Sequence, residues 1–93
     1  MTADQLEIFD VSIMRVLDVN AGRQFGLGVT AIRAHLPTYG FNEPVDAINK
    51  RLNYMSDPEV GFVTTVNKGQ FNPANVTWKI TARGINHLRS IGH

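Results

Sequence analysis

The side chains most able to do chemistry in this chain are two asparagines and a lysine on one predicted helix. Apolar residues recur every three or four positions over residues 43–56, so the opposite face of that helix must carry the polar residues. This polar face presents Asn49, Lys50 and Asn53. A carboxamide offers a donor beside an acceptor, as the edge of adenine requires, and an ammonium suits guanine or phosphate. The pattern allows hydrogen bonding to a nucleic acid, and an ordinary solvated helix face has the same composition.

Other residues give this face a mixed charge. Asp46 and Tyr54 lie on it, and Glu43 begins the predicted helix. Carboxylates are repelled by phosphates, so both acids count against a nucleic-acid partner. Asp46 could be neutralised by Lys50 at i+4, or could accept a hydrogen bond from a cytosine amino group. Arg51 borders the apolar stripe, where its stem could cover the core as readily as its head could reach a phosphate.

Positive charge gathers toward the C-terminus, although the net charge is only +1. Residues 1–20 hold four acids and one arginine, residues 21–59 hold four charges of each sign, and residues 60–93 hold four cations and no acid. Such an asymmetry suggests that one end of the molecule faces a polyanion. A chance distribution of so few charges is the alternative.

Cations and amides outside this helix extend the candidate surface. Lys68 and Gln70 lie in a polar segment, residues 67–75, that suits contact with phosphate or a minor groove. A solvated loop is the plainer interpretation of that segment. Arg33 and Arg83 lie near the starts of predicted helices, where each is a candidate for holding a phosphate.

Apolar periodicity predicts the helix that opens the chain. Residues 3–19 carry one stripe at helical spacing, and Thr2 opens a capping-box pattern. Ile8, Val11 and Met14 lie off this stripe, so the helix has more apolar surface than one core face needs. We expect these three to pack under the C-terminal helix or against a second subunit. The stripe consists of Leu6, Phe9, Ile13, Val16 and Leu17.

Two further helices are expected next, joined by a turn. Residues 29–36 predict a short helix that Pro37 ends, because the residue before a proline resists helical geometry. Residues 38–42 then form the turn. Residues 43–56 predict the next helix, with Asn42 as its cap and a proline in its first turn. Its buried stripe consists of Val45, Ile48, Leu52 and Met55.

The hydrophobic period then changes to two. Residues 60–66 and 76–81 are rich in β-branched and aromatic side chains, which predicts a β-hairpin with residues 67–75 as its long tip. Residues 81–91 predict a last helix, capped by Thr81. The apolar residues that anchor this helix are Ile85, Leu88 and Ile91.

The order of these elements resembles that of winged helix-turn-helix domains. Residues 32–36 look like the second helix of such regulators, and residues 48–63 resemble a recognition helix that runs into the first wing strand. Residues 80–88 are similar to the Leu-Thr-x-x-Gly-x-x-x-Leu segment that follows the wing in MarR-like and PadR-like regulators. The likeness covers about residues 5–91 and implies an α+β fold with three helices, a two-stranded β-hairpin wing and a C-terminal helix.

The resemblance implies double-stranded DNA as the partner. In such domains the third helix enters the major groove, while the wing touches the backbone or the minor groove. We therefore predict a single domain over residues 1–93 that serves as a small transcriptional regulator or a phage- or plasmid-type control protein. The alternative is a winged helix used for protein–protein contact, because a fold does not fix its function. The candidate DNA contacts are Asn49, Lys50, Asn53, Tyr54, Arg33, Lys68, Gln70 and Arg83.

The surplus apolar residues of the first and last helices predict a homodimer, whose two-fold axis would match a palindromic site. The alternative is that the two helices cover each other. The predicted core of the domain consists of Leu6, Phe9, Ile13, Leu17, Ile32, Leu36, Ile48, Leu52, Trp78 and Ile80.

The rest of the composition narrows the class of protein. The chain has no cysteine, which excludes disulfides and thiol catalysis and fits a reducing compartment. His35, His87 and His93 are too widely spaced to predict a metal site, and no catalytic set stands out, so we expect no enzyme activity, cofactor or small-molecule ligand. No apolar run approaches the ~20 residues of a membrane span. Asp4 and Glu7 stand where a signal peptide carries basic residues, so a cytoplasmic location is expected.

Overall fold

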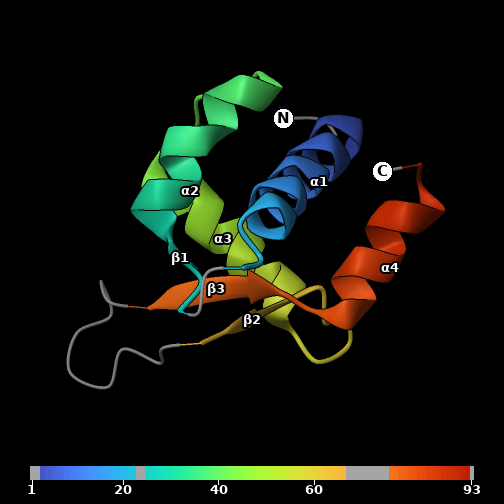
Figure 1. The fold of residues 1–93 in the computed structure, drawn as a ribbon. Coiled ribbons are helices and arrows are strands. Elements are labelled where there is room, and N and C mark those ends of the chain that lie inside the picture. The colour runs from blue at the N-terminus through green and yellow to red at the C-terminus, as the bar shows by residue number, and fades with distance from the viewer. Residues whose placement is uncertain (1–2, 23–24, 67–75, 93) are drawn as a thin grey trace.

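The structure is a computed structural model that describes residues 3–22, 25–66 and 76–92 (Figure 1). These residues form an α+β arrangement of four α-helices, one short 3-10 helix and a three-stranded antiparallel sheet. Figure 1 shows α1 between α2 and α4, with the sheet across the ends of the helices. The chain order is α1 (Ala3–Val19), β1 (Leu27–Gly28), α2 (Val29–His35), η1 (Leu36–Tyr39), α3 (Val45–Ser56), β2 (Val63–Thr65), β3 (Thr77–Ile80) and α4 (Ala82–Ser90).

The first helix, α1, has the predicted bounds, and its stripe enters the core. The side-chain Nδ2 of Asn20 donates to the Val16 carbonyl at 2.8 Å, which satisfies one of the last carbonyls of the helix. Thr2, the predicted start of the capping box, lies outside the described residues. Of the surplus apolar residues, Met14 is buried in the core, while Ile8 remains exposed. Met14 is therefore covered within the chain, as the first of the two expected alternatives requires, and needs no second subunit.

The link between α2 and α3 is more regular than expected. The predicted helix over residues 29–36 ends one residue early, and η1, which has Pro37 in its first turn, takes up the first two residues of the predicted turn 38–42. Gly40 ends η1 with a φ of 88°, a left-handed conformation that glycine adopts without a steric penalty. Helix α2 has Gly28 as its N-cap, which has no side chain to donate or accept a capping hydrogen bond.

The start of α3 corrects the prediction by two residues. The helix begins at Val45 and its N-cap is Pro44, so Asn42 does not cap it and Glu43 is not helical. The physical reason is again proline, since the residue before it is held in an extended conformation. The apolar stripe is confirmed for Ile48, Leu52 and Met55, which are fully buried, whereas Val45 is only half-buried.

The sheet has the order β1-β3-β2 and contains a strand that the sequence did not predict. In β1, Leu27 pairs with Trp78 and is buried beside it. Two residues are too short to show a period of two, so periodicity could not have found this strand. Strands β2 and β3 are shorter than the predicted segments 60–66 and 76–81, and the predicted hairpin tip lies outside the described residues.

One core joins the four α-helices, η1 and the sheet. The predicted core is confirmed except for Leu6 and Ile80, which are only half-buried. In α4, Leu88 is buried, Ile85 is half-buried, and Ile91 is 40% exposed beyond the end of the helix. The buried apolar residues are Phe9, Ile13, Met14, Val16, Leu17, Leu27, Ile32, Leu36, Ile48, Leu52, Met55, Val63, Trp78 and Leu88.

Thr81 joins α4 to the turn between α3 and β2. As predicted, it is the N-cap of α4, and its hydroxyl accepts a hydrogen bond from the Gly84 amide at 3.0 Å. The same hydroxyl donates to the Gly61 carbonyl at 2.5 Å, while the Thr81 amide donates to the Phe62 carbonyl at 3.0 Å. Gly84 lies directly against that Phe62 carbonyl. The Thr-x-x-Gly spacing therefore has a local physical cause: it caps a helix and lets that helix approach the backbone at Phe62, just before β2.

This close approach makes a prediction for Gly84→Ala. Alanine normally stabilises a helix interior by about 1 kcal/mol relative to glycine. Here its Cβ would meet the Phe62 carbonyl and would lie 2.7 Å from Cγ1 of Ile80. We expect the free energy of unfolding to fall by about 1–3 kcal/mol, as for an overpacked core, measured by urea denaturation followed by circular dichroism.

The matched control is Gly22→Ala, because nothing lies within 4 Å of a Cβ added at Gly22. That variant should be neutral or slightly more stable than the parent. Equal unfolding midpoints for the two variants would contradict the proposed packing of α4 on Phe62.

Candidate nucleic-acid interface

The buried stripe of α3 determines which of its side chains face outward. Successive residues of a helix are rotated by about 100°, so Lys50 lies opposite Ile48 and Leu52, and Asn53 lies about 60° from Lys50 on the side of Asn49. Both are exposed, and neither side chain has a hydrogen-bond or ion-pair partner among the described residues. Asp46 is exposed on the same side, and it is not within ion-pair distance of Lys50 in the described part of the chain. This outward face therefore carries one unpaired cation, one unpaired acid and an amide.

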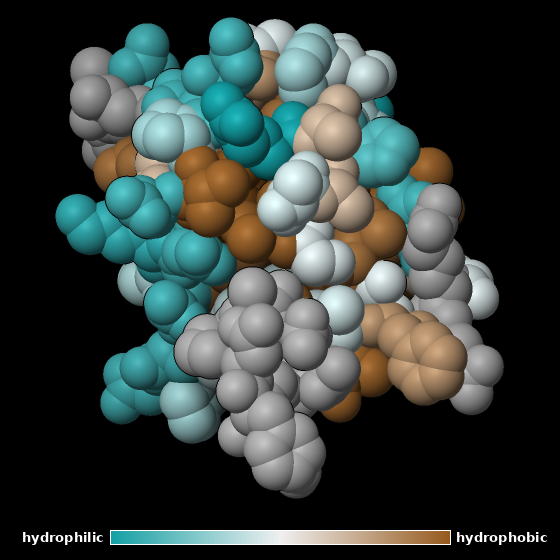
Figure 2. Space-filling view, turned by 90° about the vertical axis from the view of Figure 1, so that its left-hand side faces the viewer, coloured by the Kyte–Doolittle hydropathy of each residue, from teal (hydrophilic) through white to brown (hydrophobic). Residues whose placement is uncertain are grey.

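Asn49 and Asn53 lie on the side of α3 that faces the sheet. They line a groove of about 590 Å³ between α3, the start of α2 and the ends of the strands. Figure 2 looks at the molecule from the α2 side and shows hydrophobic side chains reaching the surface between hydrophilic ones. The groove thus has two side-chain amides beside a mainly apolar lining. Its other lining residues are Val29, Thr30, Val45, Thr65, Val76 and Trp78.

Tyr54 lies on the other side of α3, away from this groove. Its ring lies under the guanidinium of Arg51, with Cζ 4.5 Å from the ring centroid. It borders a second groove together with residues of α1 and with Phe62 and His87, whose rings stack at 4.5 Å. The structure therefore does not bring Tyr54 together with Asn49 and Asn53.

Arg51 is an internal anchor of α3 and is not available to a partner. Its Nε and one terminal nitrogen donate to the two carboxylate oxygens of Asp10, at 2.8 and 2.6 Å. The Arg51 and Asp10 side chains are only 22% and 13% exposed. The hydrogen bond to Asp10 raises the pKa of Arg51 above its ordinary value, against the opposing effect of burial. Sequence reasoning missed this pair because the two residues are 41 positions apart.

Arg33 and Arg83 lie beside opposite ends of α3. Arg33 is in the last turn of α2, not near its start as predicted, and its Nε donates to the carbonyl of Glu43 at 3.0 Å, just before α3. Arg83 is the second residue of α4 and lies against Gly61, which follows the end of α3. Both arginines are exposed. Lys68 and Gln70 lie outside the described residues.

Acids near α3 include one with a structural role. The Asp57 carboxylate accepts a hydrogen bond from the Glu59 amide at 2.9 Å, and its carbonyl accepts from the amides of Val60 and Gly61. Asp57 therefore shapes the turn that ends α3. Its charge nevertheless lies near the C-terminal end of the candidate surface.

Other kinds of site find no support in the described part of the chain. Among residues 3–22, 25–66 and 76–92, no group of three or more His, Asp or Glu side chains could hold a metal ion. No helix in the same ranges is long and apolar enough to cross a membrane.

Comparison with protein-family models, with curated proteins and with solved structures finds no match for this chain. The function has to be argued from the site itself.

The anchoring of α3 predicts the effect of Asp10→Asn. The neutral amide would leave the Arg51 guanidinium without its ionic partner in a mostly buried position. We expect the variant to be less stable at pH 7 by about 1–3 kcal/mol, measured by chemical denaturation. Asp18→Asn is the control, because Asp18 is exposed near the C-terminal end of α1, where a negative charge is unfavourable. Equal losses in the two variants would mean that the pair contributes nothing to stability.

Proposed function

We propose that the protein binds double-stranded DNA as a winged helix-turn-helix domain, with α3 as the helix that enters the major groove. The observation that carries the proposal is the outward face of α3, which presents Lys50 and Asn53 without partners among the described residues. The two exposed arginines beside the ends of this helix, Arg33 and Arg83, add to it.

The arrangement of elements supports the same proposal. Helix α2 precedes α3 across a short link, and β2 follows α3 and pairs with β3, in the order of a helix-turn-helix followed by a wing. The third strand, β1, pairs with the other edge of β3. In domains of this kind the second helix of the motif reads base edges in the major groove.

The spacing of the charges fits the proposed role. A 12-residue helix is about 18 Å long, so Arg33 and Arg83, beside its two ends, flank the residues that would meet base edges. Both arginines are therefore candidates for contacts with backbone phosphates. Lys50 and the amides of Asn49 and Asn53 would then meet base edges. Phosphate neutralisation would supply affinity and the base contacts would supply sequence preference.

The biological role that follows is that of a small transcriptional regulator or a phage- or plasmid-type control protein.

A second function is favoured by one observation: Asp46 is exposed and unpaired beside Lys50, where it would repel phosphate. Under that alternative the same face of α3 binds a protein.

Lys50→Ala tests the electrostatic part of the proposal. We expect weaker binding to a fluorescently labelled duplex in an anisotropy titration. If Lys50 meets a phosphate, the slope of log affinity against log salt should also fall by about one ion. Arg89→Ala is the matched control, since it removes one positive charge from the exposed surface of α4 and should leave both quantities unchanged. A parent protein without salt-dependent binding would overturn the DNA proposal and favour the protein partner.

Asn53→Ala tests base recognition. On a duplex selected from a random pool for tight binding, the variant should lose about 1–3 kcal/mol, and on an arbitrary duplex it should lose little. Asn86→Ala, which removes an exposed amide from α4, should change neither affinity. Equal affinity of Asn53→Ala and the parent for the selected duplex would exclude Asn53 as a base contact.

A further inference from the structure

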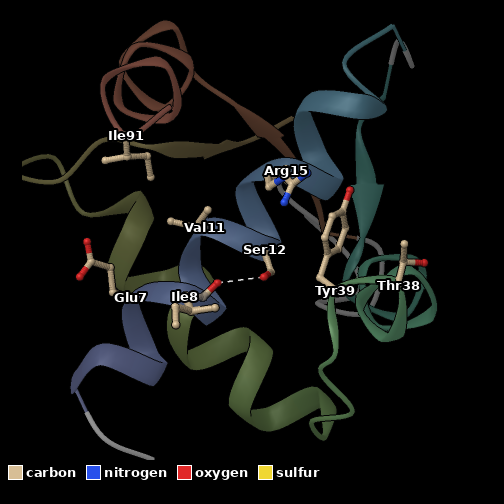
Figure 3. Close-up of a pocket in the computed structure, with 8 residues that line it drawn as sticks. All are labelled: Glu7, Ile8, Val11, Ser12, Arg15, Thr38, Tyr39 and Ile91. Atoms are coloured by element: carbon tan, nitrogen blue, oxygen red, sulfur yellow. Dashed lines mark hydrogen bonds between the residues drawn. The ribbon is translucent and has the colours of Figure 1, made fainter. Parts of the chain in front are cut away.

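We propose that the outward face of α1 joins two copies of this chain through a two-fold axis that passes beside Val11. This α1 face consists of Glu7, Ile8, Val11 and Arg15 and forms part of a groove of about 500 Å³. Figure 3 shows the four side chains along α1, with Glu7 and Arg15 toward opposite ends. The inference does not depend on DNA binding.

Apolar side chains are left open to solvent along this groove. Ile8 is 56% exposed, and Ile91, which follows α4, is 40% exposed. Thr38 and Tyr39 of η1 form the opposite wall. Large apolar side chains gathered in one groove mark a surface that binds another molecule more often than isolated ones do.

The polar group beside these apolar residues is already satisfied. The Ser12 side chain is buried, and its hydroxyl donates to the Ile8 carbonyl at 2.9 Å. Covering the groove would therefore leave this hydroxyl with its partner and would avoid the penalty for a buried unpaired group. The Ser12 side chain is also small, so it leaves room in the groove between the larger side chains of α1.

The charges on the α1 face are complementary to themselves, which identifies a second copy as the occupant. A two-fold axis perpendicular to a helix at residue 11 brings residue 11−n of one copy opposite residue 11+n of the other. Glu7 and Arg15 are each four residues from Val11, about 6 Å along the helix and rotated by about 40° in opposite directions. The axis therefore puts each carboxylate at the height of the guanidinium of the other copy, and two equivalent ion pairs form if the helices cross at an angle that offsets the opposite rotations.

Arg15 is already held in place for such a pair. Its guanidinium lies over the ring of Tyr39, with Cζ 4.7 Å from the ring centroid, and Figure 3 shows the two side chains next to each other. A side chain that is ordered before association loses less conformational entropy on binding. The cation–π contact leaves the guanidinium edge available to a carboxylate.

The same symmetry constrains the crossing angle of the two helices. It would bring Asp4 of one copy opposite Asp18 of the other, and like charges there would repel. A crossing near −50°, the common ridge-in-groove class, separates the helix ends while keeping Val11, Glu7 and Arg15 in contact. We therefore expect the contact between the two α1 helices to be centred on Val11.

The test is sedimentation equilibrium of the full chain at about 10–100 μM, without DNA. The parent should be a dimer, and Val11→Asp should be a folded monomer because it places two carboxylates at the axis. Glu7→Lys and Arg15→Glu should each weaken the dimer at least about tenfold, because each converts two attractive pairs into repulsive ones. Glu59→Lys is the control for the charge change, since Glu59 is exposed outside α1 and the groove.

Mixing the two charge-reversed variants is the decisive measurement. In a mixed pair, the lysine at position 7 meets the glutamate at position 15, and the unchanged Arg15 and Glu7 meet each other, so dimerisation should recover as a heterodimer. Circular dichroism checks that every variant is folded. A parent that stays monomeric at 100 μM would overturn the proposal. Dimers that resist Val11→Asp, or charge-reversed variants that do not recover on mixing, would also overturn it. None of these results bears on whether the monomer binds DNA.

Discussion

The complete burial of one stripe of α3 is the constraint on which the candidate surface depends. Ile48, Leu52 and Met55 are wholly shielded from solvent. A rotation of the helix by a single residue, about 100°, would expose part of this stripe and bury Lys50 or Asn53 without a partner. The core therefore decides which polar side chains α3 presents. The Arg51–Asp10 pair acts in the same direction, because it fixes the edge of α3 that faces α1.

The hydrogen bonds of Thr81 fix the position of α4 relative to α3. Because the Thr81 hydroxyl bonds both Gly61 and Gly84, the turn after α3 and the first turn of α4 are held as one unit. Arg83 lies within that unit, two residues after Thr81, so its position beside the end of α3 depends on the cap. The candidate surface is thus assembled from three helices, and its geometry relies on hydrogen bonds that lie outside it.

The features predicted correctly from the sequence are those encoded locally. The 17 residues of α1 repeat one stripe often enough to define its bounds, and Thr81 caps α4 through an atom only three residues away. Features that depend on distant parts of the chain were missed. Strand β1 exists because Leu27 pairs with Trp78, and Arg51 turns inward because Asp10 is opposite to it. The polar face of α3 was predicted as one surface, but tertiary packing puts Asn49 and Asn53 at one groove and Tyr54 at another, and leaves Lys50 outside both.

The distribution of cations connects the two proposed surfaces. Among the described cations, Arg51 is held by Asp10 and Arg15 lies over Tyr39, whereas Arg33, Lys50 and Arg83 lie on α3 or beside its ends. These three residues alone would give a salt slope of only about −2.7, which is small for a DNA-binding protein. Three phosphate contacts by themselves would hold DNA weakly at physiological salt. Two copies joined through α1 would double the number of phosphate contacts and make the second binding event intramolecular. Dimerisation would therefore raise the affinity for DNA of a domain whose own net charge is close to zero.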